Sequence, residues 1–222
     1  MKKLAVILIV LTLSVSTCAC ATAIDKYNDK ISELRDELIV GESEGVEVEI
    51  ICGRRESSFN IDGNSTPKCD FTVITVTSEI FALSTVVNYA FNFNGQTYDG
   101  ALNKHPLKNS YSTELPFRVS GEIDLKITQG KIEKIVKTKT VKTERTISAN
   151  RALEVAQIRL ADKFSECSSN GKLNAEIYIR YIKNPISTAH GYYWYVALCP
   201  NATTVYAVLI DEVSATVVAV RE

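Results

Sequence analysis

The chain has 222 residues, of which 45% are hydrophobic and 23% are charged, and its formal net charge is −1. This balance excludes a strong bulk attraction to nucleic acid and is typical of a globular protein. The length allows two small domains or one large sandwich after an N-terminal leader is removed.

Residues 1–23 have the layout of a secretory signal peptide. Two lysines precede an apolar run over residues 4–13, which is too short to span a bilayer, and small residues follow. Ala21-Thr22-Ala23 fits an A-x-A cleavage site, whereas the sequence before Cys20 resembles a bacterial lipoprotein signal. We therefore expect an extracytoplasmic protein, either secreted or lipid-anchored to the cell envelope through Cys20.

The segment 24–41 predicts an amphipathic N-terminal helix that ends at Gly41. Its apolar residues recur at alternating spacings of 3 and 4, namely Ile24, Tyr27, Ile31, Leu34 and Leu38. This stripe extends over only about two heptads, so we expect a helix packed on its own protein or a spacer from the membrane.

From residue 45 to 145 the apolar residues alternate with polar ones, and turn signals such as Asn94-Gly95 separate the runs. About six or seven short strands over 100 residues predict an all-β antiparallel sandwich of immunoglobulin-like or fibronectin-like strand count. Residues 131–145 are rich in basic side chains, and Lys137 and Lys139 project from one face of a strand. They either protect an exposed sheet edge or bind an anionic envelope polymer or lipid headgroup.

Four cysteines follow the leader: Cys52, Cys69, Cys167 and Cys199. An exported chain enters an oxidising compartment, so we expect two disulfide bonds, and pairing within each half of the chain is the simplest connectivity. The alternative is that the thiols are free and buried.

Residues 146–222 predict a small α+β domain. Ser148 suits the N-cap of a helix whose alanine, leucine and phenylalanine residues recur every four positions, and four apolar strands follow. A sheet of this kind covers its apolar face with the single helix.

Several short motifs in this region resemble the PepSY domain. They are Ile147 to Ala156, Trp194-Tyr195-Val196, Val208 to Asp211, Ser214 and Val217-Val218. The resemblance implies a small α+β fold of the PepSY or cystatin-like type and, since that family is associated with restraint of peptidases, a peptidase as partner. Ala215 departs from the pattern, because the family has glycine in this turn.

Strand alternation places Trp194 on the face toward the helix and Tyr193 and Tyr195 on the opposite face, beside Tyr178 and Arg180. Exposed tyrosine with arginine is typical of recognition surfaces. We therefore predict these four residues as a partner-binding site, the alternative being an ordinary sheet surface.

The sequence contains no recognisable catalytic motif, no paired-histidine or CxxC metal spacing and no cofactor-binding motif. We expect no enzyme activity, cofactor or metal. The predicted function is an exported, non-catalytic protein-binding module that regulates an extracellular peptidase in trans. The alternative is a structural or adhesive lipoprotein of the cell envelope.

Overall fold

The computed structural model describes residues 22–57, 67–81, 86–185 and 191–222. Cys20 and all but the last two residues of the predicted signal peptide lie outside these ranges. None of the helices in the described ranges is both long enough and apolar enough to cross a membrane.

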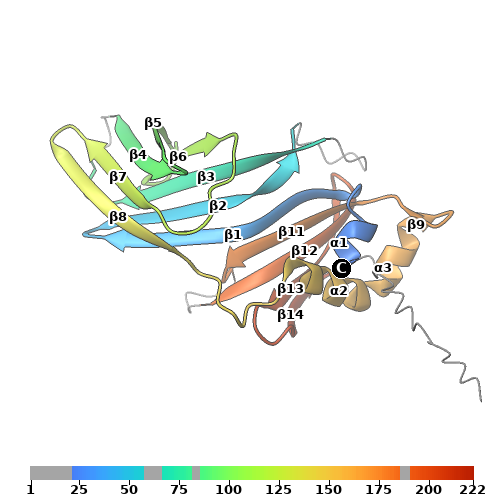
Figure 1. Cartoon of the computed structure of the whole chain (residues 1–222). Helices are drawn as coiled ribbons and strands as arrows, with labels where there is room; N and C mark the ends of the chain where they lie inside the picture. The colour runs from blue at the N-terminus through green and yellow to red at the C-terminus, as the bar shows by residue number, and fades with distance from the viewer. Residues whose placement is uncertain (1–21, 58–66, 82–85, 186–190) are drawn as a thin grey trace, which may run out of the picture.

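Eight of the described strands form a closed antiparallel barrel, in the order β1-β2-β3-β6-β5-β4-β7-β8, with β8 pairing back onto β1 (Figure 1). The strands are β1 (Ile31–Ser43), β2 (Val46–Glu56), β3 (Lys68–Ser78), β4 (Val87–Phe93), β5 (Gln96–Lys104), β6 (Ser110–Leu115), β7 (Asp124–Gln129) and β8 (Ile132–Thr140).

The barrel is filled by its own side chains. Alternate residues of β2 point inward, and Val46, Ile50 and Cys52 have no exposed surface. Closure requires β8 to approach β1 closely at Gly41, where a Cβ atom would lie 2.6 Å from the carbonyl oxygen of Lys137. The strands' period-2 pattern therefore encodes a packed core rather than a ligand-holding lumen.

The C-terminal strands extend the same sheet. The order β14-β13-β12-β11 continues from β1, and β11 runs parallel to β1. These strands are β11 (Glu176–Lys183), β12 (Tyr192–Asn201), β13 (Thr204–Asp211) and β14 (Val217–Arg221), and a separate small ladder joins β9 (Ser168–Ser169) to β10 (Lys172–Leu173).

One edge of the long strand β1 has two successive neighbours. Its residues 31–35 pair with β11, whereas residues 39–41 pair with β8, and β2 pairs along the other edge. This division lets β1 belong to the barrel and to the C-terminal sheet at once. The two parts diverge at the point where β8 replaces β11.

Three helices cover one face of the C-terminal sheet (Figure 1): α1 (Ala23–Lys26), α2 (Ala149–Arg159) and α3 (Ala161–Glu166). Ser148 caps α2 as predicted, accepting a hydrogen bond from the backbone N–H of Arg151 at 3.2 Å. Trp194 is fully buried on this face, and its indole N–H donates to the carbonyl of Ile147 at 3.1 Å.

The predicted fold class, a β-sandwich followed by an α+β domain of the PepSY or cystatin-like type, is wrong. The protein is nearly all-β, with a closed barrel whose sheet runs on into the outer strands. Strand count and turn signals do not distinguish a sandwich from a barrel, because the distinction depends on whether the last strand pairs with the first.

The predicted N-terminal helix over 24–41 is also wrong, because most of this segment is β1. The strand buries residues in both cores: Leu34 and Leu38 contact the C-terminal core, and Ile39 contacts the barrel core. Register shifts between Ile31 and Glu33 and between Arg35 and Glu37 further break the alternation. Because β1 buries side chains on both of its faces and contains bulges, its apolar residues recur at spacings of 3 and 4, as they do in a helix.

The two expected disulfide bonds are absent, because all four cysteines are free: Cys52, Cys69, Cys167 and Cys199. In the β2–β3 ladder Cys52 pairs with Thr72, whereas Cys69 pairs with Arg55. Three residues of strand separate the two cysteines by about 10 Å, beyond the Cα–Cα reach of a disulfide.

The second expected pair is separated by the C-terminal sheet. Cys167 packs against the helix-covered core, whereas Cys199 belongs to a small buried cluster with Tyr178, Ala197 and Ala207. Burial raises the pKa of the Cys199 thiol to about 11, with the nearby Glu176 carboxyl adding to the effect. The buried thiol is therefore protonated and unreactive at neutral pH.

Candidate functional site

The structure brings the four predicted partner-binding residues together on the face of the C-terminal sheet that the helices leave uncovered. Arg180 pairs with Tyr195 across the β11–β12 ladder, Ile182 pairs with Tyr193, and Tyr178 pairs with Ala197. Cross-strand partners share a face, so these side chains are neighbours. We call the surface formed by Arg180, Tyr193 and Tyr195, with Tyr178 buried beneath Arg180, the tyrosine–arginine face.

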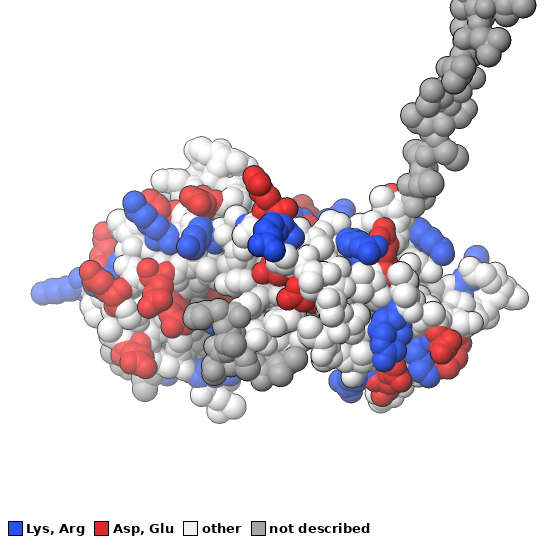
Figure 2. Space-filling view, turned by 90° about the horizontal axis from the view of Figure 1, so that it is seen from below, with Lys and Arg blue, Asp and Glu red and all other residues white. Residues whose placement is uncertain are grey.

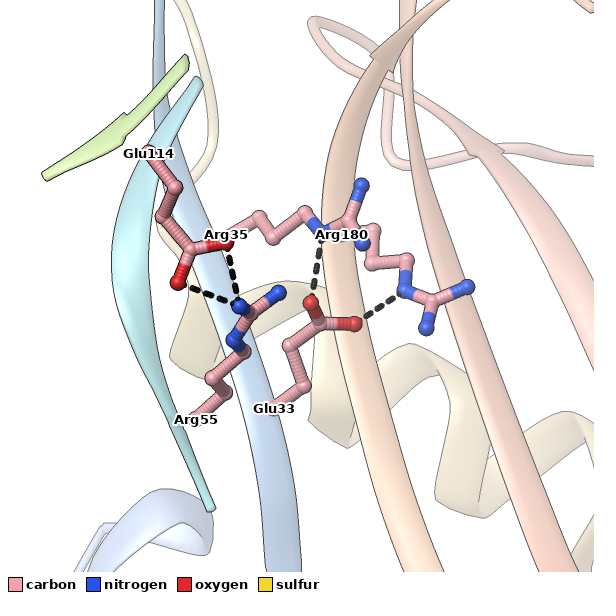
Figure 3. A network of polar contacts seen from close by, with 5 residues as sticks. All are labelled: Glu33, Arg35, Arg55, Glu114 and Arg180. Carbon is pink, nitrogen blue, oxygen red and sulfur yellow. Dashed lines mark hydrogen bonds and ion pairs between the residues drawn. The ribbon is translucent and has the colours of Figure 1, made fainter. Parts of the chain in front are cut away.

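Beside this face lies a buried carboxylate held by two arginines (Figure 3). Glu33 has no exposed surface, and it accepts a hydrogen bond from Nε of Arg35 at 2.6 Å and from Nε of Arg180 at 2.5 Å. The register of β1 with β11 places Glu33 beside Tyr178 and Arg35 beside Arg180. One negative charge therefore fixes two positive side chains from neighbouring strands.

The two guanidinium groups keep their terminal nitrogens available. Arg35 and Arg180 each use Nε for Glu33, their side chains are 26% and 27% exposed, and within the described ranges no hydrogen bond or ion pair uses their terminal nitrogens. Figure 3 shows both terminal forks pointing away from the carboxylate. The cluster therefore carries a net positive charge with planar donors already oriented for a carboxylate.

Tyr178 supports Arg180 from below. Its ring is only 3% exposed, the Arg180 guanidinium carbon lies 5.2 Å from the ring centre, and its hydroxyl donates to Glu176 at 2.5 Å. Burial and this hydrogen bond to the carboxylate raise the pKa of Tyr178 far above its ordinary value. Tyr178 thus positions the arginine through a cation–π contact instead of offering a surface of its own.

Tyr193 and Tyr195 are half-buried on this face, and Tyr193 lies opposite Ile182 in the β11–β12 ladder. Tyr195 packs against Ala197 and the other members of the small cluster around Cys199. Burial raises the pKa of Tyr195, so its hydroxyl stays protonated as a hydrogen-bond donor. These two rings form the apolar part of the face, adjacent to the arginine forks.

A further ion pair borders the cluster on the barrel side. Arg55 of β2 contacts Glu114 of β6 at 2.5 Å and covers the Phe71 ring, with 4.6 Å between its guanidinium carbon and the ring centre. Figure 3 shows this pair on the same side of the sheet as Glu33. The polar row therefore crosses from the barrel to the C-terminal strands.

Sequence reasoning missed Glu33, Arg35, Arg55 and Glu114. The first two fell within the predicted helix, where they would be solvent-exposed. The one available signal was the -E-x-R- spacing in a β-compatible segment, because residues two apart lie on the same face of a strand.

Lys137 and Lys139 do not protect a sheet edge, because β8 pairs with β7 on one side and with β1 on the other. Their surroundings also contain several carboxylates, including Glu42 and Glu47. On the face of the molecule drawn in Figure 2, positive and negative side chains are likewise interspersed.

The described ranges contain no group of three or more histidine, cysteine, aspartate or glutamate residues that could hold a metal ion. His105 has a local structural role, since its Nδ1 accepts backbone hydrogen bonds from Leu107 and Lys108 at 3.1 and 3.0 Å. His190 lies outside the described residues.

Comparison with known proteins finds no matching family model, no matching curated protein and no matching solved structure.

Proposed function

We propose that the chain is a non-catalytic, extracytoplasmic protein that binds a protein partner through the tyrosine–arginine face. One observation carries this proposal: the fully buried Glu33 fixes Arg35 and Arg180, whose terminal nitrogens form no hydrogen bond within the described ranges, and Arg180 lies directly opposite Tyr195. Tyrosine and arginine are the residue types in which interface hot spots are enriched.

The arrangement favours binding because the arginine side chains are already ordered in the folded protein, so binding a partner costs less conformational entropy. A free arginine loses rotamer freedom when it binds a carboxylate, whereas Arg180 is already held by Glu33 and by the ring of Tyr178. A partner that presents an acidic side chain to the arginine forks and an apolar residue to the two tyrosines would complement this surface. The expected epitope on the partner therefore combines an acidic side chain with a neighbouring aromatic or aliphatic one.

Identification of the captured partner as an extracellular peptidase would extend the proposed function from protein binding to regulation of that enzyme in trans.

The test is affinity capture from the producing organism's envelope and culture medium. The bait is the mature chain, compared with a Tyr193→Ala, Tyr195→Ala double variant and with an Ile158→Ala control on the exposed side of α2. If the two tyrosines are hot spots, their loss should lower the affinity for the partner by more than about 2 kcal/mol, or about 30-fold. The control should leave the affinity unchanged. Equal capture by all three baits would refute the proposed surface.

A further inference from the structure

A second surface lies at the fork where β8 replaces β11 beside β1. A groove of about 960 Å³ runs over the outer surface of β8, β1, β2 and β3, and the ends of β11 and β12 add Lys183 and Tyr192 to its lining. Val40 and Gly41 of β1 lie at its centre, between the lysines of β8 and the glutamates of β2.

The strand registers determine which charged residues of the groove lie opposite one another. Val40 pairs with Lys139 on one side and with Glu49 on the other, and Glu49 pairs in turn with Thr75. Two residues further along β1, Glu42 lies directly opposite Glu47. Positive charge therefore lies on β8, negative charge on β1 and β2, and hydroxyl groups on β3.

In the part of the chain that the structure describes, these charges are not held in ion pairs, although Lys183 and Arg35 lie near enough to Glu49 to act on its carboxylate. Within the described ranges, no ion pair or side-chain hydrogen bond involves the charged residues lining the groove, which are Glu42, Glu47, Glu49, Glu122, Lys137, Lys139 and Lys183. Like charges directly opposite each other in a ladder destabilise it, as Glu42 and Glu47 do here. Burial also raises the pKa of Glu49, because desolvation of its carboxylate outweighs the attraction of the nearby Lys183 and Arg35.

We propose that this groove binds a short zwitterionic peptide, with its amine against Glu42, Glu47 and Glu49 and its carboxylate against Lys137 and Lys139. The lysines of β8 and the glutamates of β2 are two strand spacings apart, or about 10 Å. An extended tripeptide has about the same separation between its terminal charges. A polyanion would meet the glutamates and a polycation the lysines, so a ligand carrying both charges fits the lining best.

Tyr192 supplies the apolar contact of the site. Its half-buried ring stands at the end of β12 and lines the groove together with Lys183. A central aromatic or aliphatic residue of the peptide packs there, which predicts a preference for a side chain larger than that of glycine at the second position.

The proposal is tested by isothermal titration calorimetry with the tripeptide Ala-Tyr-Ala and with its N-acetylated and C-amidated forms. Blocking either end is expected to weaken binding at least tenfold. The Lys137→Met, Lys139→Met variant should bind the free and the amidated peptide equally, and the Glu42→Gln, Glu47→Gln variant should bind the free and the acetylated peptide equally. All substituted side chains are exposed, so circular dichroism should show an intact fold.

Matched controls are Lys131→Met and Glu144→Gln, which change exposed charges outside the groove. Both are expected to bind all three peptides as the native chain does. Absence of binding to the free tripeptide at millimolar concentration, or affinity that does not change when the ends are blocked, would overturn the proposal. The proposal would also be overturned if the control variants lost as much peptide affinity as the groove variants. The site is separate from the tyrosine–arginine face, so neither proposal depends on the other.

Discussion

Glu33→Gln tests how strongly the buried carboxylate organises the sheet around it. The substitution keeps the shape and one acceptor oxygen but leaves Arg35 and Arg180 without a counter-charge. Removing one partner of a fully buried pair costs about 3–5 kcal/mol. The arginine side chains are 26% and 27% exposed, so water compensates part of the loss. We expect the free energy of unfolding to fall by about 2–3 kcal/mol.

The assay is urea denaturation followed by tryptophan fluorescence, since Trp194 is buried in the adjoining core. With a slope of about 2 kcal/mol per molar, the midpoint should fall by about 1–1.5 M. Glu114→Gln is the matched control, because Glu114 is 49% exposed in its pair with Arg55 and should contribute less than about 1 kcal/mol. A shift for Glu33→Gln no larger than for Glu114→Gln would refute the assigned role of the buried carboxylate.

Three further predictions concern local features. Gly53→Ala should destabilise the fold by more than about 3 kcal/mol in the same urea assay, because its Cβ would lie 2.1 Å from the carbonyl oxygen of Leu34. Ala215 has a φ of 59°, so Ala215→Gly should raise the melting temperature, with relief of about 1–2 kcal/mol of strain only partly offset by unfolded-chain entropy. Backbone hydrogen bonds from Ser214 lower the pKa of Asp211, so its stabilisation is present above the unfolded pKa and is lost as pH falls through the folded one. Asp211→Asn should therefore flatten the decline in stability as the pH falls below the ordinary pKa of aspartate, and an unchanged decline at acid pH would contradict this.

Local patterns in the sequence were sufficient where one face of an element is buried. The period-2 runs of the barrel, the helix capped by Ser148 and the inward side of Trp194 all follow from alternation or capping. The grouping of Tyr193, Tyr195 and Arg180 on one face followed from the same argument.

Long-range pairing could not be predicted in the same way. The closure of β8 onto β1, and the exchange of β8 for β11 along one edge, depend on contacts about 100 or more residues apart. The buried carboxylate was hidden for the same reason, because Glu33 is buried only when Arg180 lies on the neighbouring strand. The thiols are free because the strand register and the opposite faces of the sheet keep the cysteines apart, and the number of cysteines in the sequence gives no information on either.

The central claim is that the uncovered face of the C-terminal sheet binds a protein partner, and site-specific photocrosslinking tests it most directly. A photoreactive amino acid is placed at Tyr193 or at the exposed helix position Ile158, and the labelled chains are irradiated in the producing cells' envelope fraction. We predict a discrete crosslinked product from position 193, lost when Arg180→Ala is added, and none from position 158. No product from position 193, or the same product from both positions, would contradict the account.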